Sequence, residues 1–466
     1  MNSIKRASPL YFLAACALAV SPLVASTKVT DISNLDSVQV ASIFTPYSVA
    51  HLKKRLPSLK KPISIAGARC SQGLHIAIRN GTMVDLKELK KIVAFDKQKK
   101  QITVEAGITW RDIQKYIDRY DLALAAIQSY SDFSVGGSLS VNVHGRDIQH
   151  GSLITMVDSI DMLLASGDIV HASRTENADL FFSSIGGYGA LGIIVHATIN
   201  LVPNCALKRK VQTIPLADYK RHYFQSVITN PKIQLHNANI MLGDFDSVAS
   251  VSWCTTDRPV TVQDRLRTTQ KFYPVNMAGE ALLRKNKIGH HVREKVEMKE
   301  AETPLIVWRN YEMGHTINTL KPVSRIISSS ILQEYFIPVD QFETFAKQLK
   351  KIIKSDGIDM LNVSIRHVPA DKGTTLPYAP QESFAFVCYL NIFNNSISQN
   401  RAKAWTQKLI NAALACGGTY YLPYQPWATR EQFMQAYPGC TMLREHKKKY
   451  DPTNTFNSNF IQRYIL

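Results

Sequence analysis

The sequence SVGGSLSVNVHG runs from Ser134 to Gly145, and a related stretch, FFSSIGGYGALGIIVHATINLVP, follows from Phe181 to Pro203. Glycine allows another group to approach the backbone closely and permits positive φ, which a residue with a Cβ atom resists. Both stretches return at once to the β-branched residues that are typical of strands. We therefore expect the backbone of both stretches to pack directly against one large, flat group.

A third stretch of small residues, AGARCSQG from Ala66 to Gly73, follows a short apolar strand at 63–66. Backbone N–H groups in such a loop can bind a diphosphate, and Arg69 adds a charged partner. The loop is neither GxGxxG nor a Walker motif with its lysine, so neither a Rossmann nor a P-loop domain fits. The three stretches together predict a dinucleotide-binding site for a molecule with a large planar ring.

Strands interleaved with short helices predict an α+β domain over residues 27–204. The segment 205–430 carries several strand-like runs and two helical patterns, at 339–354 and 398–415. It predicts an antiparallel sheet covered by helices on one face, which would form a substrate or cap domain. The C-terminal segment, 431–466, is expected to return to the first domain.

Composition narrows the classes of function. The net charge is +18, which favours anionic partners, but no nucleic-acid-binding motif is present. No CxxC pair occurs, so we predict no metal site. Lys5 and Arg6 precede an apolar run, and residues 1–26 therefore predict a signal peptide or an N-terminal anchor. We expect an exported protein, periplasmic or membrane-associated, with the charged stretch 285–299 as a candidate contact with a membrane surface.

The region from Val38 to Pro203 resembles the FAD-binding domain of the vanillyl-alcohol-oxidase/p-cresol-methylhydroxylase superfamily. The matching motifs are the loop at 66–73, MVDL (83–86), VEAGITW (104–110), SVGG with NVHG, and GGYGALGII (186–194). The rest resembles alditol and aldonolactone oxidases and decaprenylphosphoryl-ribose oxidase, notably at LQEYFIP (332–338) and in the ending YDPTNTFNSNFIQRYIL.

The resemblance implies a bound FAD and the residues that contact it. These are Ala66, Gly67, Ala68, Arg69, Cys70, Ser71, Gln72 and Gly73 at the diphosphate; Ser134, Val135, Gly136, Gly137, Asn142, Val143, His144 and Gly145 along the isoalloxazine and ribityl; Ile193 and Ile194 at the adenine; and Tyr421. Relatives with a covalent flavin carry His in the loop where this chain has Cys70, which excludes a histidyl link there. A cysteinyl link is the alternative, and we expect non-covalent FAD.

The resemblance also implies a catalytic set that this chain only partly keeps. Alditol oxidases place Glu and Arg two residues apart on a strand and add a C-terminal Lys. The matching positions here are Ser364, Arg366 and Tyr424, and Gln333 matches a substrate-side glutamine.

The base is therefore open among His367, Glu334, Tyr424 and Tyr335. Strand alternation puts Ser364 and Arg366 on one face and His367 on the other. Tyr424 would serve as an acid or base if the arginine depressed its pKa. The candidates for the catalytic site are Tyr424, Arg366, Gln333 and His367.

The resulting hypothesis is an FAD-dependent oxidoreductase that takes a hydride from a CH–OH group of a sugar-like, polyol or glycolipid substrate. One alternative is a flavoprotein that reduces a C=C or C=N bond or works as an electron-transfer partner. Another is a non-catalytic surface protein that keeps only the fold. Val143 is bulkier than Gly or Ala beside the flavin, so we expect electrons to pass to a quinone or a protein rather than to oxygen.

Overall fold

The computed structural model describes residues 26–268, 289, 295, 298–299, 303–317 and 327–466. The predicted leader, apart from Ser26, and most of the charged stretch 285–299 lie outside these residues. Within the described ranges, no helix combines the length and the apolar character needed to cross a bilayer.

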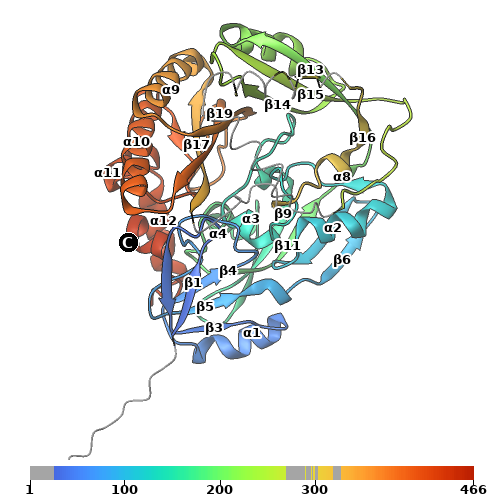
Figure 1. Ribbon diagram of the computed structural model, residues 1–466. Helices are drawn as coiled ribbons and strands as arrows, with labels where there is room; N and C mark the ends of the chain where they lie inside the picture. Colours follow the sequence, from blue (N-terminus) through green and yellow to red (C-terminus); the bar gives the residue numbers. More distant parts are fainter. Residues whose placement is uncertain (1–25, 269–288, 290–294, 296–297, 300–302, 318–326) are drawn as a thin grey trace, which may run out of the picture.

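The N-terminal region contains a parallel sheet and a larger antiparallel one (Figure 1). The parallel sheet has the order β3 (Ser42–Phe44), β5 (Thr82–Asp85), β4 (Ile63–Ala66). The antiparallel sheet has the order β10 (Ile169–Ser173), β9 (Val157–Leu163), β11 (Ile193–Asn200), β7 (Gln101–Glu105), β6 (Ile92–Asp96). A separate hairpin pairs β1 (Thr27–Thr30) with β2 (Ser37–Val40).

Short helices connect these strands. They are α1 (Val49–Arg55), α2 (Trp110–Ile117), α3 (Val135–Ser140) and α4 (Ala178–Ser184). The side chain of Thr109 accepts a hydrogen bond from the N–H of Asp112 and so caps α2. The glycine-rich stretch from 134 forms α3 rather than a strand or an open loop.

The segment expected to form the substrate domain contains one antiparallel sheet, which has eight strands in the described part of the chain. Their order is β16 (Ile306–Trp308), β13 (Ala206–Pro215), β15 (Ser247–Thr255), β14 (Ile233–Ile240), β18 (Met360–Val368), β19 (Ser383–Phe393), β17 (Ser328–Pro338), β20 (Thr419–Tyr420). The pairs are antiparallel. The strand-like runs expected in the segment 205–430 correspond to strands of this sheet, although the first, at 238–242, overlaps only the end of β14.

Two long helices, α9 (Phe342–Asp356) and α10 (Ser396–Ala415), cover one face of this sheet (Figure 1). Phe345 of α9 packs on Tyr335 of β17 and Phe386 of β19, with ring centroids 5.6 and 5.0 Å apart. Gly357 ends α9 at φ 59°, a conformation that glycine adopts without strain. The α+β class with a helix-covered antiparallel sheet is confirmed.

The C-terminal segment, with α11 (Arg430–Ala436) and α12 (Cys440–Tyr450), meets the N-terminal region beside β4. Ile63 donates to the carbonyl of Thr455 at 2.7 Å and accepts from the N–H of Asn457 at 2.8 Å. Buried side chains of both regions form one continuous apolar core. The domain limits stay predictions, although β13 opens the second sheet close to the expected boundary.

Candidate functional site

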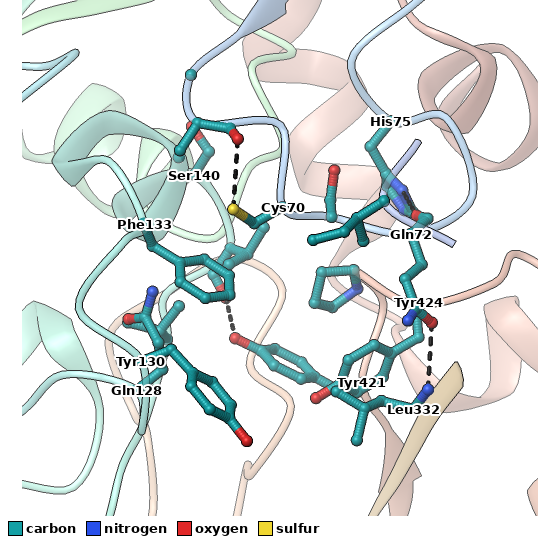
Figure 2. Close-up of a pocket in the computed structure, with 18 of the residues that line it drawn as sticks. Cys70, Gln72, His75, Gln128, Tyr130, Phe133, Ser140, Leu332, Tyr421 and Tyr424 are labelled. Carbon is teal, nitrogen blue, oxygen red and sulfur yellow. Dashed lines mark hydrogen bonds between the residues drawn. The ribbon is translucent and has the colours of Figure 1, made fainter. Parts of the chain in front are cut away.

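A cavity of 660 Å³ lies between the N-terminal region and the uncovered face of the eight-stranded sheet. Figure 2 shows the part of its lining that comes from loops after β4 and around α3, from β17 and from the segment after β20. Strands β18 and β19 line it as well. Many residues proposed from the resemblance line it: Gly67, Ala68, Arg69, Cys70, Ser71, Gln72, Ser134, Gly136, Gly137, Val143, His144, Ile194, Tyr421, Arg366 and Tyr424. The three glycine stretches therefore meet at one place.

Ser134 joins the first two glycine stretches. Its hydroxyl accepts a hydrogen bond from the N–H of Ala68 at 3.1 Å. A Cβ atom on Gly67 would lie only 2.1 Å from the same oxygen, so a side chain there would displace Ser134. Glycine at 67 thus lets the loop approach the start of α3.

Backbone forms much of the wall on this side of the cavity. Five glycines line it: Gly67, Gly136, Gly137, Gly189 and Gly192. A Cβ atom on Gly137 would have Ser134 Oγ, at 3.0 Å, as its one neighbour within 4 Å among the described residues. Apart from this hydroxyl oxygen, the space beside Gly137 is therefore open, which suits the flat ring system and chain of a dinucleotide cofactor.

The loop after β4 is held by its own contacts. Arg69 adopts φ 56° and pairs with the buried Asp85 at 2.5 Å, so part of its charge is already neutralised. The side chain of Gln72 accepts from the N–H of Leu332 at 3.2 Å, which ties the loop to β17 (Figure 2). Cys70 lines the cavity, and its thiol donates to the carbonyl of Ala68 at 3.3 Å.

Six residues that were expected to contact the cofactor do not line the cavity and lie behind the residues that do. They are Ala66, Gly73, Val135, Asn142, Gly145 and Ile193. A Cβ atom on Gly145 would meet the carbonyl oxygen of Ile127 at 2.0 Å, and one on Gly73 would meet Pro426 at 2.3 Å. Asn142 donates to Asp371 at 3.1 Å and accepts from the N–H of Ile154 at 3.0 Å. Ala66, Val135 and Ile193 are buried in the apolar core. Their role in this structure is to shape the wall rather than to line it.

A hydrogen-bonded group of charged and polar side chains stands on the sheet side of the cavity. Glu334 of β17 is 2% exposed, and its Oε1 lies 2.5 Å from Nε2 of His144. Its Oε2 accepts from the Tyr424 hydroxyl at 3.0 Å. Arg366 of β18 donates to the Ser129 hydroxyl at 3.0 Å. The tyrosine next to this group, Tyr421, donates to the carbonyl of Val141 at 2.9 Å (Figure 2).

Glu334 and Ser364 lie in the same row across the sheet. Each is paired with Val387 of the intervening strand β19, Glu334 from β17 and Ser364 from β18. All three line the cavity. A serine thus stands at the position that the resemblance matches to a glutamate, and a carboxylate stands two strands away on the same face.

Two expected catalytic residues, Gln333 and His367, lie outside the lining of the cavity. Neither lines the cavity, because each alternates with a neighbour that does: Leu332 and Glu334 for the first, Arg366 for the second. His367 stacks on Tyr223, with centroids 4.7 Å apart, and contacts Glu382 at 2.8 Å. Gln333 is buried, at 2% exposed. The separation of His367 from Arg366 agrees with the strand alternation.

The charges in this group influence one another. Burial raises the pKa of Glu334, but His144, Arg366 and the Tyr424 hydroxyl outweigh it, and the pKa falls below its ordinary value. Burial lowers the pKa of Arg366, which Glu334 opposes. Burial and Glu334 raise the pKa of Tyr424 well above its ordinary value despite Arg366. The hypothesis that the arginine makes Tyr424 an ionisable base is therefore wrong, and Tyr424 is a neutral donor.

Sequence reasoning missed several residues of the lining. Gln128, Tyr130, Asn237, His315 and Tyr389 come from loops and strands with no motif to mark them. His75 also lines the cavity, and its ring lies between two carbonyls, 2.5 Å from Gln72 O and 2.8 Å from Leu422 O. One sequence signal could have identified lining residues of β17. Ser330, Leu332 and Glu334 alternate along this strand, and all three line the cavity.

Comparison with known proteins agrees with this geometry. Residues 41–173 match the FAD binding domain family. L-gulonolactone oxidase of Scyliorhinus torazame is 24% identical over 90% of this chain and 94% of its own length. L-gulonolactone oxidase of Mus musculus is 32% identical over 34% of this chain and 37% of its own. D-arabinono-1,4-lactone oxidase of Yarrowia lipolytica is 33% identical over 34% of this chain and 32% of its own.

The alignments above 30% identity thus span about a third of the Mus musculus and Yarrowia lipolytica enzymes. The alignment with the Scyliorhinus torazame enzyme has lower identity but spans nearly all of both chains. The chain carries an FAD-binding domain of the p-cresol-methylhydroxylase type, and aldonolactone oxidases are among its homologues.

Proposed function

We propose that this protein is an FAD-dependent oxidoreductase that oxidises a CH–OH group of a sugar lactone or a related sugar-like substrate. The observation that carries the proposal is the arrangement of the cavity. Bare glycine backbone forms one wall, and Glu334, Arg366 and Tyr424 stand on the sheet side. The aldonolactone oxidases among the relatives support the same substrate class.

The residues present fit FAD. The loop from Gly67 to Gln72, the stretch around Gly137 and the region of Ile194 would hold it, since these segments line the cavity with backbone and small side chains. When bound, FAD supplies a two-electron oxidant that accepts a hydride. Arg366 and the neutral Tyr424 hydroxyl are the donors that can orient a hydroxylated substrate and stabilise negative charge that develops on its oxygen.

The proposal is tested on the holoenzyme in the absence of air. L-gulono-1,4-lactone, D-arabinono-1,4-lactone and a set of polyols are added one at a time, and the flavin absorbance band is followed. We expect at least one lactone to bleach the flavin at a saturable rate. A folded, FAD-containing protein that no lactone or polyol reduces would contradict the proposed function.

We further propose that FAD is held without a covalent link, that electrons pass to a quinone or protein acceptor, and that the protein is exported. Val143 lines the cavity and is 5% exposed, so a branched side chain occupies this wall. Rapid peroxide formation with air as the sole oxidant would refute the choice of acceptor. Cell fractionation with antibody detection tests the location, and a cytoplasmic protein of full length would refute export.

A further inference from the structure

We propose that Glu334 is the catalytic residue that accepts the hydroxyl proton of the substrate. This inference rests on the proposed function and goes beyond it, because it moves the proton acceptor from the strand position implied by the resemblance to a different strand. Among the described residues that line the cavity, Glu334 is the one carboxylate.

The location of Glu334 fits this role. It lies in the row Glu334–Val387–Ser364, on the cavity face of the sheet. Val387 cannot take a proton, and a serine hydroxyl is a poor base, so the row retains one group able to accept a proton. Arg366, which comes two residues after Ser364, borders the same cavity and adds positive charge near Glu334.

The contacts of Glu334 keep it ionised and fixed. Burying a carboxylate is costly unless it is paired and hydrogen-bonded. His144 holds one oxygen and the Tyr424 hydroxyl holds the other, at 2.5 and 3.0 Å. Each carboxylate oxygen can accept more than one hydrogen bond, so the group retains acceptor capacity for a substrate hydroxyl.

Other groups of the cavity wall are less suited to accept the proton. His75 has both ring nitrogens directed at carbonyls. His144 has its Nε2 on Glu334, and His315 lies 3.7 Å from Glu312. Tyr424 is a neutral phenol that already donates to Glu334.

The step balances as a two-electron oxidation. The C–H bond of the carbinol breaks, and its hydrogen leaves with both electrons as a hydride, for which FAD held by the loop from Gly67 to Gln72 would supply the two-electron acceptor. The O–H bond breaks in the same process, its proton goes to a Glu334 carboxylate oxygen, and its electron pair forms the new C=O bond. The alcohol carbon is oxidised, and Glu334 ends as a neutral acid.

The first test is Glu334→Gln, which keeps the shape and removes the base. Flavin reduction by the best lactone substrate is measured in anaerobic stopped-flow with wild-type and variant holoenzymes. General-base catalysis contributes about 100-fold to 10,000-fold, so we expect the limiting reduction rate to fall by at least about 100-fold. The matched control is Glu382→Gln. Glu382 also pairs with a histidine, His367, whose side chain lies away from the cavity, and this variant should reduce its flavin at the wild-type rate.

The second test separates base catalysis from a structural role. Glu334→Ala leaves space for a small carboxylate, and added formate should raise its rate of flavin reduction in a saturable manner, while chloride should not. A wild-type rate in Glu334→Gln, or a flavin-loaded Glu334→Ala that reacts with lactone but ignores formate, would overturn the inference. Either result leaves the proposed function intact if the wild-type flavin is bleached. A wild-type flavin that no lactone bleaches rejects the proposed function itself.

Discussion

The contact between Gly67 and Ser134 allows a quantitative test of how the cavity wall is built. In Gly67→Ala, the new Cβ atom would lie 2.1 Å from Ser134 Oγ and 3.2 Å from Ser134 Cβ. The hydroxyl must therefore rotate away, and its hydrogen bond from the N–H of Ala68, now 3.1 Å, is lost. In Ser134→Ala the same hydrogen bond is lost, but nothing has to move.

The magnitudes follow from these contacts. One hydrogen bond contributes about 0.5–1.5 kcal/mol to stability, and crowding in a packed site costs about 1–3 kcal/mol. Gly67→Ala should thus lower the free energy of unfolding by about 2–4 kcal/mol and Ser134→Ala by about 1 kcal/mol. The double variant no longer carries the hydroxyl clash and loses the bond only once, so it should lose about 1–2 kcal/mol.

The assay is a double-mutant cycle by chemical denaturation, with the FAD dissociation constant measured by flavin fluorescence as a second readout. The cycle should give a coupling of at least about 1 kcal/mol between the two sites, and Ser134→Ala should restore part of the FAD affinity lost in Gly67→Ala. Additive losses in both measurements would refute the reasoning that Ser134 Oγ is the atom displaced.

Three further predictions concern stability and the flavin. Burial lowers the pKa of His236 to about 3 from 6.5, so the unfolded chain binds the proton more readily. Stability should therefore fall by up to about 1.4 kcal/mol per pH unit as pH drops from 6.5 towards 3. In urea titrations over this range His236→Gln should flatten the slope, and an unchanged slope would contradict the assignment. Asp147→Asn breaks a pair with Arg309 in which both side chains are 2% exposed, and should cost about 3–5 kcal/mol. The exposed-pair control Glu445→Gln should cost less than about 1 kcal/mol by the same denaturation assay. Acid-denatured protein should release all its FAD and leave a polypeptide of unmodified mass at Cys70, and a flavin adduct in that mass spectrum would show a covalent link instead.

The glycine stretches predicted correctly that three segments meet at one cavity, because the physical demand that glycine meets is local. A backbone without Cβ atoms tolerates a close neighbour wherever that neighbour comes from. The same property limits the prediction. Gly145 meets the carbonyl of Ile127 and Gly73 meets Pro426, while Gly137 borders open space. A glycine in the sequence therefore indicates a close neighbour, but it does not indicate whether that neighbour is the protein's own backbone, a side chain or a cofactor.

The catalytic side of the cavity was harder to predict for a different reason. Strand β17 is buried on both faces from Gln333 to Ile337, with helix α9 on one side and the cavity on the other. Period-two alternation tells which residues share a face, but burial on both sides removes the polar-apolar contrast that would tell which face points where. The resemblance favoured Gln333, and a shift of one residue exchanges it for Glu334.

The ionisation of Tyr424 depended on three-dimensional neighbours. An arginine two residues beyond Ser364 suggested a lowered phenol pKa, but the depth of burial and the Glu334 carboxylate at 3.0 Å have the opposite effect. Both contributions come from residues distant in sequence, 90 positions away for Glu334. No spacing rule along the chain records such a contact.

The cavity joins segments that are far apart in the sequence, and this has a consequence for biosynthesis. The wall needs the loop at 67–72 and also Tyr421, Pro423 and Tyr424, and the last residues hold β4 in place through Thr455 and Asn457. A nascent chain cannot assemble this pocket until the segment from Tyr421 to Asn457 has been made and has left the ribosome. Flavin loading must therefore follow the synthesis of this segment, and a chain cut before Thr455 should yield a colourless protein.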